Sequence, residues 1–373
     1  MTRYIELHAI QNVPPANLNR DDTGAPKTAM YGGVLRGRVS SQAWKRAMRE
    51  HFNSRLEPEE VGRRSKHVVE LIAKAVVTQE PALRDRAEDL ATVALKSAGF
   101  KPAKPKKKEG AEDEAAQLGY LLFVSQQQID AAAKAIVDNA DAGDEKALTA
   151  AFKAVGMKKL LDSDHSVDIA LFGRMVADAP DLNVDAACQV AHALGVHEVV
   201  PEYDYFTAVD DVTEEAEEAG AGMIGTVEFY SATFYRYAAL NVDQLRKNLG
   251  DDKATQMAIS AFVEAFVEAM PSGKQNTFAN GTRPTAVMAT VASGQPTSLV
   301  GAFEEPVKDA MGHVRSAIEA LAGHAEEVFS TWRRPEQVLV CGLSSHLGTL
   351  ADVGEVVSFA DLAQRVCQDG SAS

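Results

Sequence analysis

Basic side chains gather in one short stretch of a chain that is otherwise acidic. Between residues 20 and 49 only Asp21 and Asp22 oppose seven cations, so this stretch carries a formal charge of +5, although the 373-residue chain carries -15. The seven are Arg20, Lys27, Arg36, Arg38, Lys45, Arg46 and Arg49. The rest of the chain is therefore at about -20 by subtraction. A basic stripe on an acidic body attracts phosphate at one face and repels it elsewhere. A solvated loop and helix without a partner would show the same composition.

The groups beside these cations also suit phosphate. Ser40 or Ser41 can cap a helix over about 41–53, SQAWKRAMREHF, whose basic side chains lie off its apolar face. The N–H groups at a helix N-terminus, serine hydroxyls and cations hold phosphates without reading a base sequence. Residues 18–50 therefore predict a sequence-independent phosphate site. The alternative is a structural turn and helix whose charges serve solubility.

Other motifs are weaker. GAGMIG at 220–225 has the dinucleotide-binding spacing, but an acidic run precedes it and a strand pattern follows it. The pair Gly273-Lys274 lacks the remaining residues of a phosphate-binding P-loop, and CGLSSH breaks the nucleophile-elbow pattern. Acidic doublets such as Asp21-Asp22 lack a third ligand at clear spacing. We therefore predict no catalytic residue, no metal and no cofactor.

Composition narrows the class of protein. Hydrophobic residues make up 46% and charged residues 24%, as in soluble globular proteins. The three cysteines show no CxxC spacing, which argues against a zinc site and a disulfide framework and fits a reducing cytoplasm. No apolar run approaches the roughly 20 residues of a membrane span, and the start of the chain has no signal-peptide pattern. We expect a cytoplasmic protein.

The hydrophobic periodicity predicts an α+β fold with a helical insertion. The expected elements are a strand at 3–11, a loop at 12–37, the helix at 41–53, helices at 59–78, 81–98, 117–139 and 144–155, strands at 183–196, 226–242 and 285–292, a helix at 254–270, and a C-terminal helix, strand and helix near 305–330, 336–343 and 358–368. Without the insertion the order is βαββαβ, the ferredoxin-like or RRM-like arrangement. Its sheet face often binds RNA, but the RRM aromatic signature is absent here.

Several longer motifs occur in an order that resembles one family. They are LNRDD at 18–22, YGG followed by RGRVSSQAWKRAMR at 31–49, VDIALFGRM at 167–175, VAHALGVHEV at 190–199, YFTAVDD at 205–211, GTVEFYSATFYRYAALNVDQL at 225–245 and GKQNTFA at 273–279. The chain resembles the CasC, or Cse-four, backbone subunit of the type I-E CRISPR complex Cascade, in the Cas-seven superfamily. The resemblance covers most of the chain and is weakest in the helical insertion and the C-terminal portion.

The resemblance implies a right-hand shape and a role without catalysis. The palm would be a modified RRM at 1–56 and 229–373 with a web at 163–195, the fingers would be 57–162, and the thumb would be an extended β-hairpin at 196–228. Copies would stack head-to-tail along the spacer of a CRISPR RNA and present it in segments to target DNA. Implied partners are the cap, large, small and repeat-processing endoribonuclease subunits, with a recruited nuclease-helicase, and no membrane.

The resemblance also implies roles for single residues. Those implied in guide-RNA binding are Arg20, Lys27, Arg36, Arg38, Ser40, Ser41, Gln42, Lys45, Arg46, Arg49, Arg174, Met175 and Lys274. Around the displaced nucleotide the thumb would place Tyr205, Phe206, Val209 and Ile224. The loop at 101–108 is this sequence's own and no part of the resemblance, and its lysines are possible DNA contacts: Lys104, Lys106, Lys107 and Lys108. By pattern alone, Met175 fits a core methionine, the thumb residues fit a hairpin core, and the lysines fit a solvated loop.

Two other functions stay open at this point. Related type III backbone subunits cleave target RNA with a loop aspartate and a metal, for which Asp21 or Asp22 would be the candidates. A general single-stranded RNA-binding protein would have a similar basic stripe. The presumed thumb is itself acidic, so its run at 214–218 is expected at the hairpin tip, facing solvent or the basic stripe of a neighbouring copy.

Overall fold

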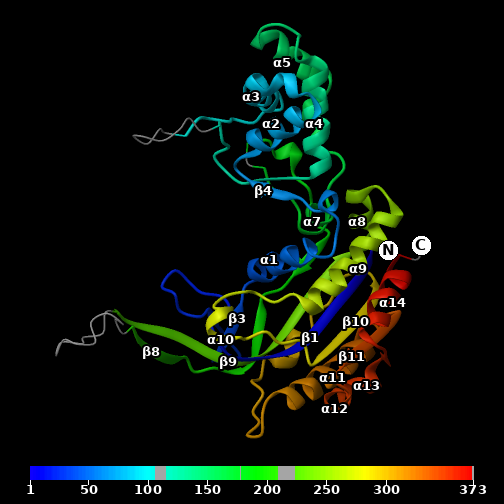
Figure 1. Cartoon of the computed structure of the whole chain (residues 1–373). Helices are drawn as coiled ribbons and strands as arrows, with labels where there is room; N and C mark the ends of the chain where they lie inside the picture. The colour runs from blue at the N-terminus through cyan, green and yellow to red at the C-terminus, as the bar shows by residue number, and fades with distance from the viewer. Residues whose placement is uncertain (106–114, 177, 209–222, 372–373) are drawn as a thin grey trace, which may run out of the picture. The chain divides into compact units, whose positions relative to one another are not determined.

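The structure is a computed structural model that describes residues 1–105, 115–176, 178–208 and 223–371. It divides into two compact units (Figure 1). Unit 1 consists of Met1–His51, Gln189–Val242 and Ile259–Ser373, and unit 2 consists of Phe52–Cys188 and Asp243–Ala258. Each unit is therefore assembled from segments that are far apart in the sequence.

Unit 1 is built on a large sheet. Its strands are β1 (Arg3–Ala16), β2 (Thr28–Tyr31), β3 (Val34–Val39), β6 (Cys188–Val190), β7 (Ala193–Glu198), β8 (Glu202–Ala208), β9 (Met223–Asn241), β10 (Ala286–Ser293), β11 (Gln337–Gly342) and β12 (Glu355–Val356). The order is β12-β11-β10-β1-β9-β7-β3-β2, and β6 and β8 also pair with β9. Along this order only the β11–β12 pair is parallel. The expectation of a mixed α and β fold is confirmed.

Helices cover both faces of this sheet. Unit 1 contains α1 (Ser41–Phe52), α10 (Gln275–Phe278), η4 (Val300–Phe303), α11 (Val314–Thr331), α12 (Ser344–Leu347), α13 (Leu350–Val353) and α14 (Phe359–Ser371), and α9 (Asp252–Glu268) enters it at Ile259. Alternate side chains of a strand point to opposite faces. Tyr235 and Tyr237 of β9 pack in the cluster that includes α11, whereas the guanidinium of Arg236 lies 3.6 Å from the ring centroid of Trp44 on α1. The face of the sheet that carries Tyr235 and Tyr237 is therefore covered by α11.

Unit 2 is mostly helical. It contains η1 (Pro58–Glu60), β4 (Arg63–Ser65), α2 (Val68–Gln79), η2 (Pro81–Arg86), α3 (Ala87–Ser97), β5 (Leu122–Val124), α4 (Gln126–Asn139), α5 (Glu145–Ala154), α6 (Met157–Leu160), α7 (Val167–Phe172), η3 (Pro180–Leu182) and α8 (Val242–Leu249). Its core is one apolar cluster that joins α2, α3 and α4. β4 and β5 form a separate two-stranded antiparallel sheet. None of the described helices is both long and apolar enough to cross a membrane.

Several boundary predictions were wrong. The helix expected at 117–139 begins at Gln126, because residues 122–124 form β5, and the strand expected at 183–196 is two short strands, β6 and β7. The expected loop at 12–37 contains the β2–β3 hairpin, because its Gly32 and Gly33 both take positive φ and form the turn. The expected helix at 59–78 begins at Val68, because residues 63–65 pair with β5 instead. The expected helix at 305–330 begins at Val314.

Candidate nucleic-acid interface

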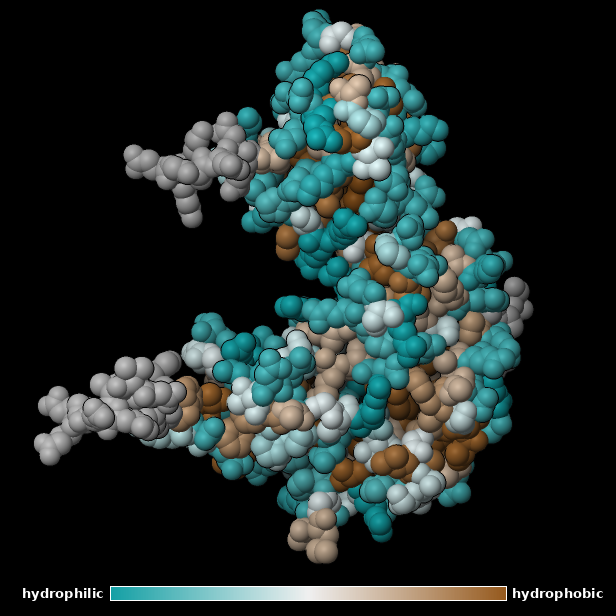
Figure 2. Space-filling view, viewed as in Figure 1, coloured by the Kyte–Doolittle hydropathy of each residue, from teal (hydrophilic) through white to brown (hydrophobic). Residues whose placement is uncertain are grey.

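A groove of about 1000 Å³ in unit 1 collects many of the predicted residues. Its lining includes Arg20, Lys27, Ser40, Gln42, Arg46 and Lys274, which come from the β1–β2 loop, α1 and the segment before α10. Four basic side chains line it against three acidic ones, Asp21, Asp22 and Glu50. The surface over α1 is largely hydrophilic (Figure 2). The arrangement suits a polyanion held by separate cations and polar groups.

The β1–β2 loop is held in shape by its own polar groups. The Asn19 carbonyl accepts the Lys27 N–H at 2.8 Å, and the Asn19 side chain accepts the Ser40 N–H at 2.9 Å. Asn17 is buried and donates to the carbonyls of Gly24 and Glu228. The loop therefore presents Arg20 and Lys27 from a fixed backbone, and Arg20 makes no ion pair within the described ranges.

The Asp21 carboxylate stabilises the β1–β2 loop through hydrogen bonds within it. One of its carboxylate oxygens accepts hydrogen bonds from the Thr23 N–H, the Thr23 hydroxyl and the Ala25 N–H. The bond from the Thr23 hydroxyl is the main cause that lowers the pKa of Asp21. Within the described residues, no three His, Cys, Asp or Glu side chains gather at a distance suited to a metal ion. Asp21 thus acts here as a turn-stabilising carboxylate.

The β1–β2 loop forms one wall of the groove, and the start of α1 forms a second. The Ser40 hydroxyl accepts the Ala43 N–H at 3.3 Å, so Ser40, rather than Ser41, caps the helix. Gln42 and Arg46 lie on the groove side of α1, and Arg46 pairs with Glu50 at 2.8 Å while remaining 77% exposed. Such an exposed pair is weak, so a phosphate can compete for Arg46. Ser41, Lys45 and Arg49 lie on the same helix but do not line the groove.

The segment before α10 forms the third wall of the groove and requires an unusual backbone conformation. Lys274 has φ of 51°, in the left-handed region that non-glycine residues seldom adopt. The preceding Gly273 packs so closely on the β1–β2 loop that a Cβ would lie 2.1 Å from the Leu18 carbonyl oxygen. Strain of this kind persists where the surrounding structure imposes it, and it often occurs at functional sites. Here it places Lys274 on the groove wall.

Two of the predicted RNA-binding arginines are buried. Arg36 of β3 is fully buried in unit 1 and donates to the carbonyls of Tyr31, Gly195, Phe303 and Glu304. Burial lowers its pKa, and the four carbonyls occupy its donors. Neighbouring Arg38 is half-buried and contacts the Thr28 carbonyl and His192. Arg36 is therefore a structural residue, contrary to the prediction, because the strand turns it inward.

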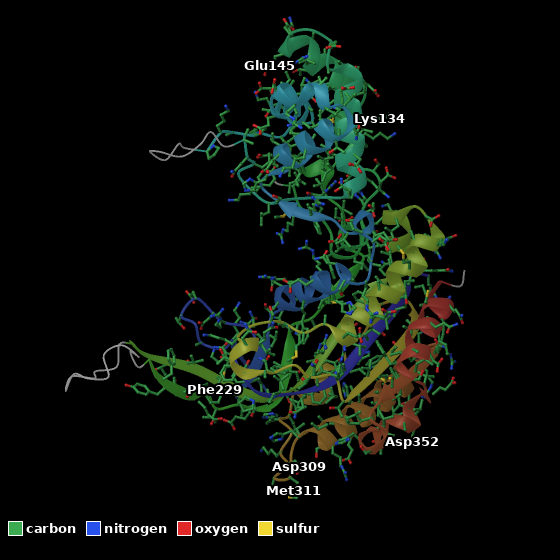
Figure 3. The ribbon with its side chains drawn as sticks, viewed as in Figure 1. Lys134, Glu145, Phe229, Asp309, Met311 and Asp352 are labelled. Atoms are coloured by element: carbon green, nitrogen blue, oxygen red, sulfur yellow. The ribbon has the colours of Figure 1, made fainter. Side chains whose placement is uncertain are left out.

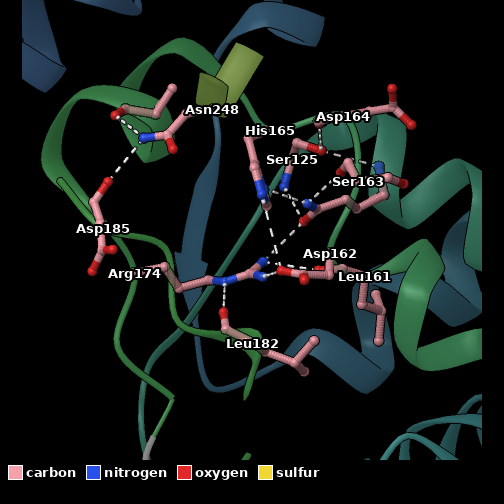
Figure 4. Close-up of polar contacts among 12 residues, drawn as sticks. Ser125, Leu161, Asp162, Ser163, Asp164, His165, Arg174, Leu182, Asp185 and Asn248 are labelled. Atoms are coloured by element: carbon pink, nitrogen blue, oxygen red, sulfur yellow. Dashed lines mark hydrogen bonds and ion pairs between the residues drawn. The ribbon is translucent and has the colours of Figure 1, made fainter. Parts of the chain in front are cut away.

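Arg174 is the other buried arginine, and it lies in unit 2 (Figure 4). It is 5% exposed and pairs with Asp162 at 2.8 Å. Its other donors reach the carbonyls of Leu161 and Leu182, each at 2.9 Å. Burial lowers the pKa of Arg174. Because the guanidinium of Arg174 is buried and bonded to protein groups, the structure contradicts its predicted contact with RNA. Adjacent Met175 is 81% exposed and is not the core methionine that periodicity suggests.

Comparison with known proteins gives the family. Residues 5–365 match the CT1975-like proteins. The chain belongs to this family. It is similar to a chain of a solved structure described as a "CRISPR RNA-guided surveillance complex, pre-nicking", with 32% identity, a TM-score of 0.84, and coverage of 98% of this chain and 100% of the other. It is also similar to a chain of a "CRISPR RNA-guided surveillance complex", with 28% identity, a TM-score of 0.73, and coverage of 98% and 99%. No curated protein sequence matches it.

In this CT1975-like chain, β8 and β9 form an extended hairpin that carries exposed aromatic side chains. Tyr205 and Phe206 are 63% and 40% exposed. Phe206 faces Gly225 on β9, where a Cβ would lie 2.3 Å from its ring. Phe229 lies at the base of the hairpin (Figure 3). It packs on Phe278, with ring centroids 5.6 Å apart. Ile224 lies on β9 opposite Thr207.

The remaining predicted residues divide between described and undescribed parts of the chain. Lys104 is exposed in unit 2. Val209, the acidic run 214–218, Lys106, Lys107 and Lys108 lie outside the described residues.

Sequence reasoning predicted the charged residues of the groove but missed those that hold its backbone in shape. Asn17 and Asn19 tie the β1–β2 loop to the strands around it, and Gly273 permits the close approach of the third wall. Tyr203, 69% exposed, lies on the same side of β8 as Tyr205 and was also missed. The preference of Asn for loop hydrogen bonds was the one signal available for the first two.

Proposed function

We propose that this chain is the guide-RNA-binding backbone subunit of a CRISPR surveillance complex of type I-E. The single observation that carries the proposal is the unit 1 groove, where Arg20, Lys27, Arg46 and Lys274 surround a concave surface. Such cations grip phosphates and leave base edges free, which a carrier of variable guide sequences requires. The similarity over 98% of the chain to subunits of RNA-guided complexes supports the same role.

The strand order supports the proposed palm. Strands β10, β1, β9 and β7 are adjacent and antiparallel, and along the chain α1 lies between β1 and β7 and α9 lies between β9 and β10. This is the 4-1-3-2 order of a ferredoxin-like or RRM-like βαββαβ unit. In this interpretation the insertion at 57–162 forms the fingers and 196–228, with the β8–β9 hairpin, forms the thumb. Because α11 covers the sheet face, RNA is held by the loops and α1 instead.

The proposed role includes assembly but not catalysis. Copies of the chain bind one CRISPR RNA in the cytoplasm, and the guide then pairs in segments with target DNA. In this proposal Tyr205 and Phe206 flank the displaced nucleotide, and Met175, whose side chain is exposed, wedges between stacked bases. The cap, large, small and repeat-processing subunits and a recruited nuclease-helicase complete the system. The use of Asp21 by its own loop argues against the metal-dependent cleavage alternative.

The test is to express the chain with a CRISPR array and its sister subunits, purify it, and sequence the bound RNA. We expect a discrete guide-length RNA shared by many protein copies. The variant Arg20→Glu with Lys27→Glu should lose this RNA, since two groove cations become anions. Lys45→Glu with Arg49→Glu extends the same test to the rest of α1.

The matched control is Lys308→Glu with Arg315→Glu, which reverses two exposed charges of unit 1 outside the groove. This control should keep its guide. A smear of cellular RNA in the unaltered protein would favour a general single-stranded RNA binder. Equal guide retention in the groove variant and the control would contradict the groove as the grip.

A further inference from the structure

Unit 1 buries an arginine that the groove itself does not use. Arg236 of β9 is 3% exposed, and its side chain points to the face of the sheet that α1 covers. Burial lowers the pKa of Arg236 to about 9, so the guanidinium stays charged at pH 7. Among the residues that the structure describes, no carboxylate lies within ion-pair distance of it, and it donates to neutral groups instead. A cation buried in this way is costly, so packing alone would favour an apolar residue at this position.

The guanidinium of Arg236 connects α1 with α9 and β1. Its central carbon lies 3.6 Å from the ring centroid of Trp44 on α1 and 4.6 Å from that of Phe266 on α9. Its terminal nitrogens donate to the side chain of Gln11 on β1 at 2.7 Å and to the Phe266 carbonyl at 2.5 Å. An arginine can stack on an aromatic ring and direct its donors in a fixed fork at the same time. Arg236 therefore fixes where α1 lies over the sheet.

Gln11 extends the same buried network to the third wall of the groove. It is 1% exposed, and its amide donates to the Thr282 carbonyl at 2.9 Å. The Thr282 N–H in turn contacts the Met270 sulfur at 3.3 Å. Met270 directly precedes residues 271–274, which line the groove. The network of Arg236 and Gln11 thus joins the α1 wall, through Trp44, to the third wall, through Met270.

The two walls that this network joins each carry a groove cation. Arg46 follows Trp44 by two residues, which places the two side chains on opposite sides of α1, so a shift of Trp44 moves Arg46 with the helix. Lys274 lies four residues after Met270. Groups that are already held in their binding arrangement lose less freedom when a ligand binds.

We propose that Arg236 is a positioning residue that, through Trp44 and Gln11, holds Arg46 and Lys274 at the separation at which one RNA strand contacts both walls. This inference rests on the proposed function and adds to it a residue that acts on the guide without touching it.

The experiment measures the affinity of the full chain for a single-stranded guide RNA over about 50 to 200 mM salt. The variants are Arg236→Met, Arg46→Gln with Lys274→Gln, and all three changes together. The control is Leu321→Ala, because Leu321 is 1% exposed in the cluster on the other face of the sheet and its loss also weakens the core of unit 1. The melting temperature of each protein is measured, and binding is compared well below the lowest of them.

Arg236→Met should make the slope of log affinity against log salt less steep by about 0.7 to 1.4, at about 0.7 per lost phosphate contact, although no groove cation is changed. In the chain that already carries Arg46→Gln and Lys274→Gln, it should reduce the slope no further. Leu321→Ala should lower the melting temperature and keep the slope. If Arg236→Met also kept the slope of the unaltered chain, or if its effect added fully to that of the groove variant, the proposal would be overturned.

A second pair of variants decides the matter if Arg236→Met does not fold. Trp44→Phe keeps an aromatic face for the guanidinium, whereas Trp44→Leu removes it. Trp44→Phe should therefore keep the slope of the unaltered chain, and Trp44→Leu should reduce it. Equal slopes for these two variants would contradict positioning through Trp44.

Failure of the proposed function has a different signature. In that case the unaltered chain would retain no guide RNA in cells, and the same slopes would be measured on a single-stranded RNA of unrelated sequence. A chain that binds no single-stranded RNA at all would overturn both proposals. A chain that retains its guide but shows one slope for all the Arg236 and Trp44 variants would overturn this inference alone.

Discussion

The loop groove of unit 1 and the Arg174 site of unit 2 use the same residue type in opposite ways. In the groove, Arg20 and Arg46 stay exposed on a polar surface, where an arginine costs little and remains available to a phosphate. At the other site, Arg174 is enclosed, and its donors are used by carbonyls and by Asp162. The contrast shows that a charge pattern locates the cationic residues but does not tell whether their side chains face solvent or the protein interior. That orientation decides whether a cation is available to a phosphate or instead stabilises the fold.

The largest effect should follow from removing the enclosed charge. Arg174→Met leaves half-exposed Asp162 without its partner and the carbonyls of Leu161 and Leu182 without their donor, and each buried group left unsatisfied costs about 1–3 kcal/mol. We expect a loss of that size in urea unfolding monitored by circular dichroism. The matched change Arg20→Met, at an exposed position, should cost less than about 0.5 kcal/mol. Equal losses would erase the distinction between the two sites.

A buried imidazole in unit 1 should give the next largest effect. His8 contacts the Tyr235 hydroxyl at 2.8 Å, and burial lowers its pKa to about 3. Its pKa in the unfolded chain is near 6.5, so between these values the unfolded state holds the extra proton and stability falls as the pH falls. The expected slope from this residue is about 1.4 kcal/mol per pH unit below 6.5.

The measurement is the difference in unfolding free energy between the unaltered chain and His8→Asn at several pH values from 7 to 4. Because buried Glu6, whose pKa is raised, titrates in both proteins, its contribution cancels in the difference. A difference that does not change with pH would show that burial does not lower the pKa of His8 in the folded state.

The groove cations should change binding far more than stability. Replacing Arg20 and Lys27 by Gln removes two phosphate contacts, so the slope of log affinity for guide RNA against log salt should fall by about 1.4, at about 0.7 per contact of a single strand. Arg36→Gln should instead lower stability and leave that slope unchanged, because its donors face carbonyls. A reduced slope for Arg36→Gln would return it to the RNA-binding set.

The smallest effect on folding is expected at Met175. With its side chain 81% exposed, Met175→Ala should change stability by no more than about 0.5 kcal/mol. In the assembled complex, however, the substitution should alter the periodic exposure of the guide to chemical probes, because the apolar wedge is gone. An unchanged probing pattern would contradict the wedge assignment, and a destabilised fold would contradict its exposure.

Much of the fold followed from local pattern. The aromatic alternation of 226–242 predicted most of β9, the serines before SQAWKR predicted the start of α1, and the apolar periodicity of 254–270 predicted α9 to within two residues at each end. These signals are local, because strand and helix periods are properties of neighbouring residues. The short strands β4 and β12 were missed because their partners, not their own residues, stabilise them.

The sequence by itself determined where the cations are, how acidic the remainder is, and which family motifs the chain carries. Only the tertiary structure decided that Arg20, Lys27, Arg46 and Lys274 share one groove while Arg36 and Arg174 are enclosed. The physical reason is that the environment of a long side chain depends on distant backbone. Arg36 donates hydrogen bonds to carbonyls as remote in the sequence as that of Glu304, and Lys274 reaches the groove because Gly273 fits against Leu18. Contacts of this kind, between residues far apart in the sequence, cannot be predicted from the spacing of residue types.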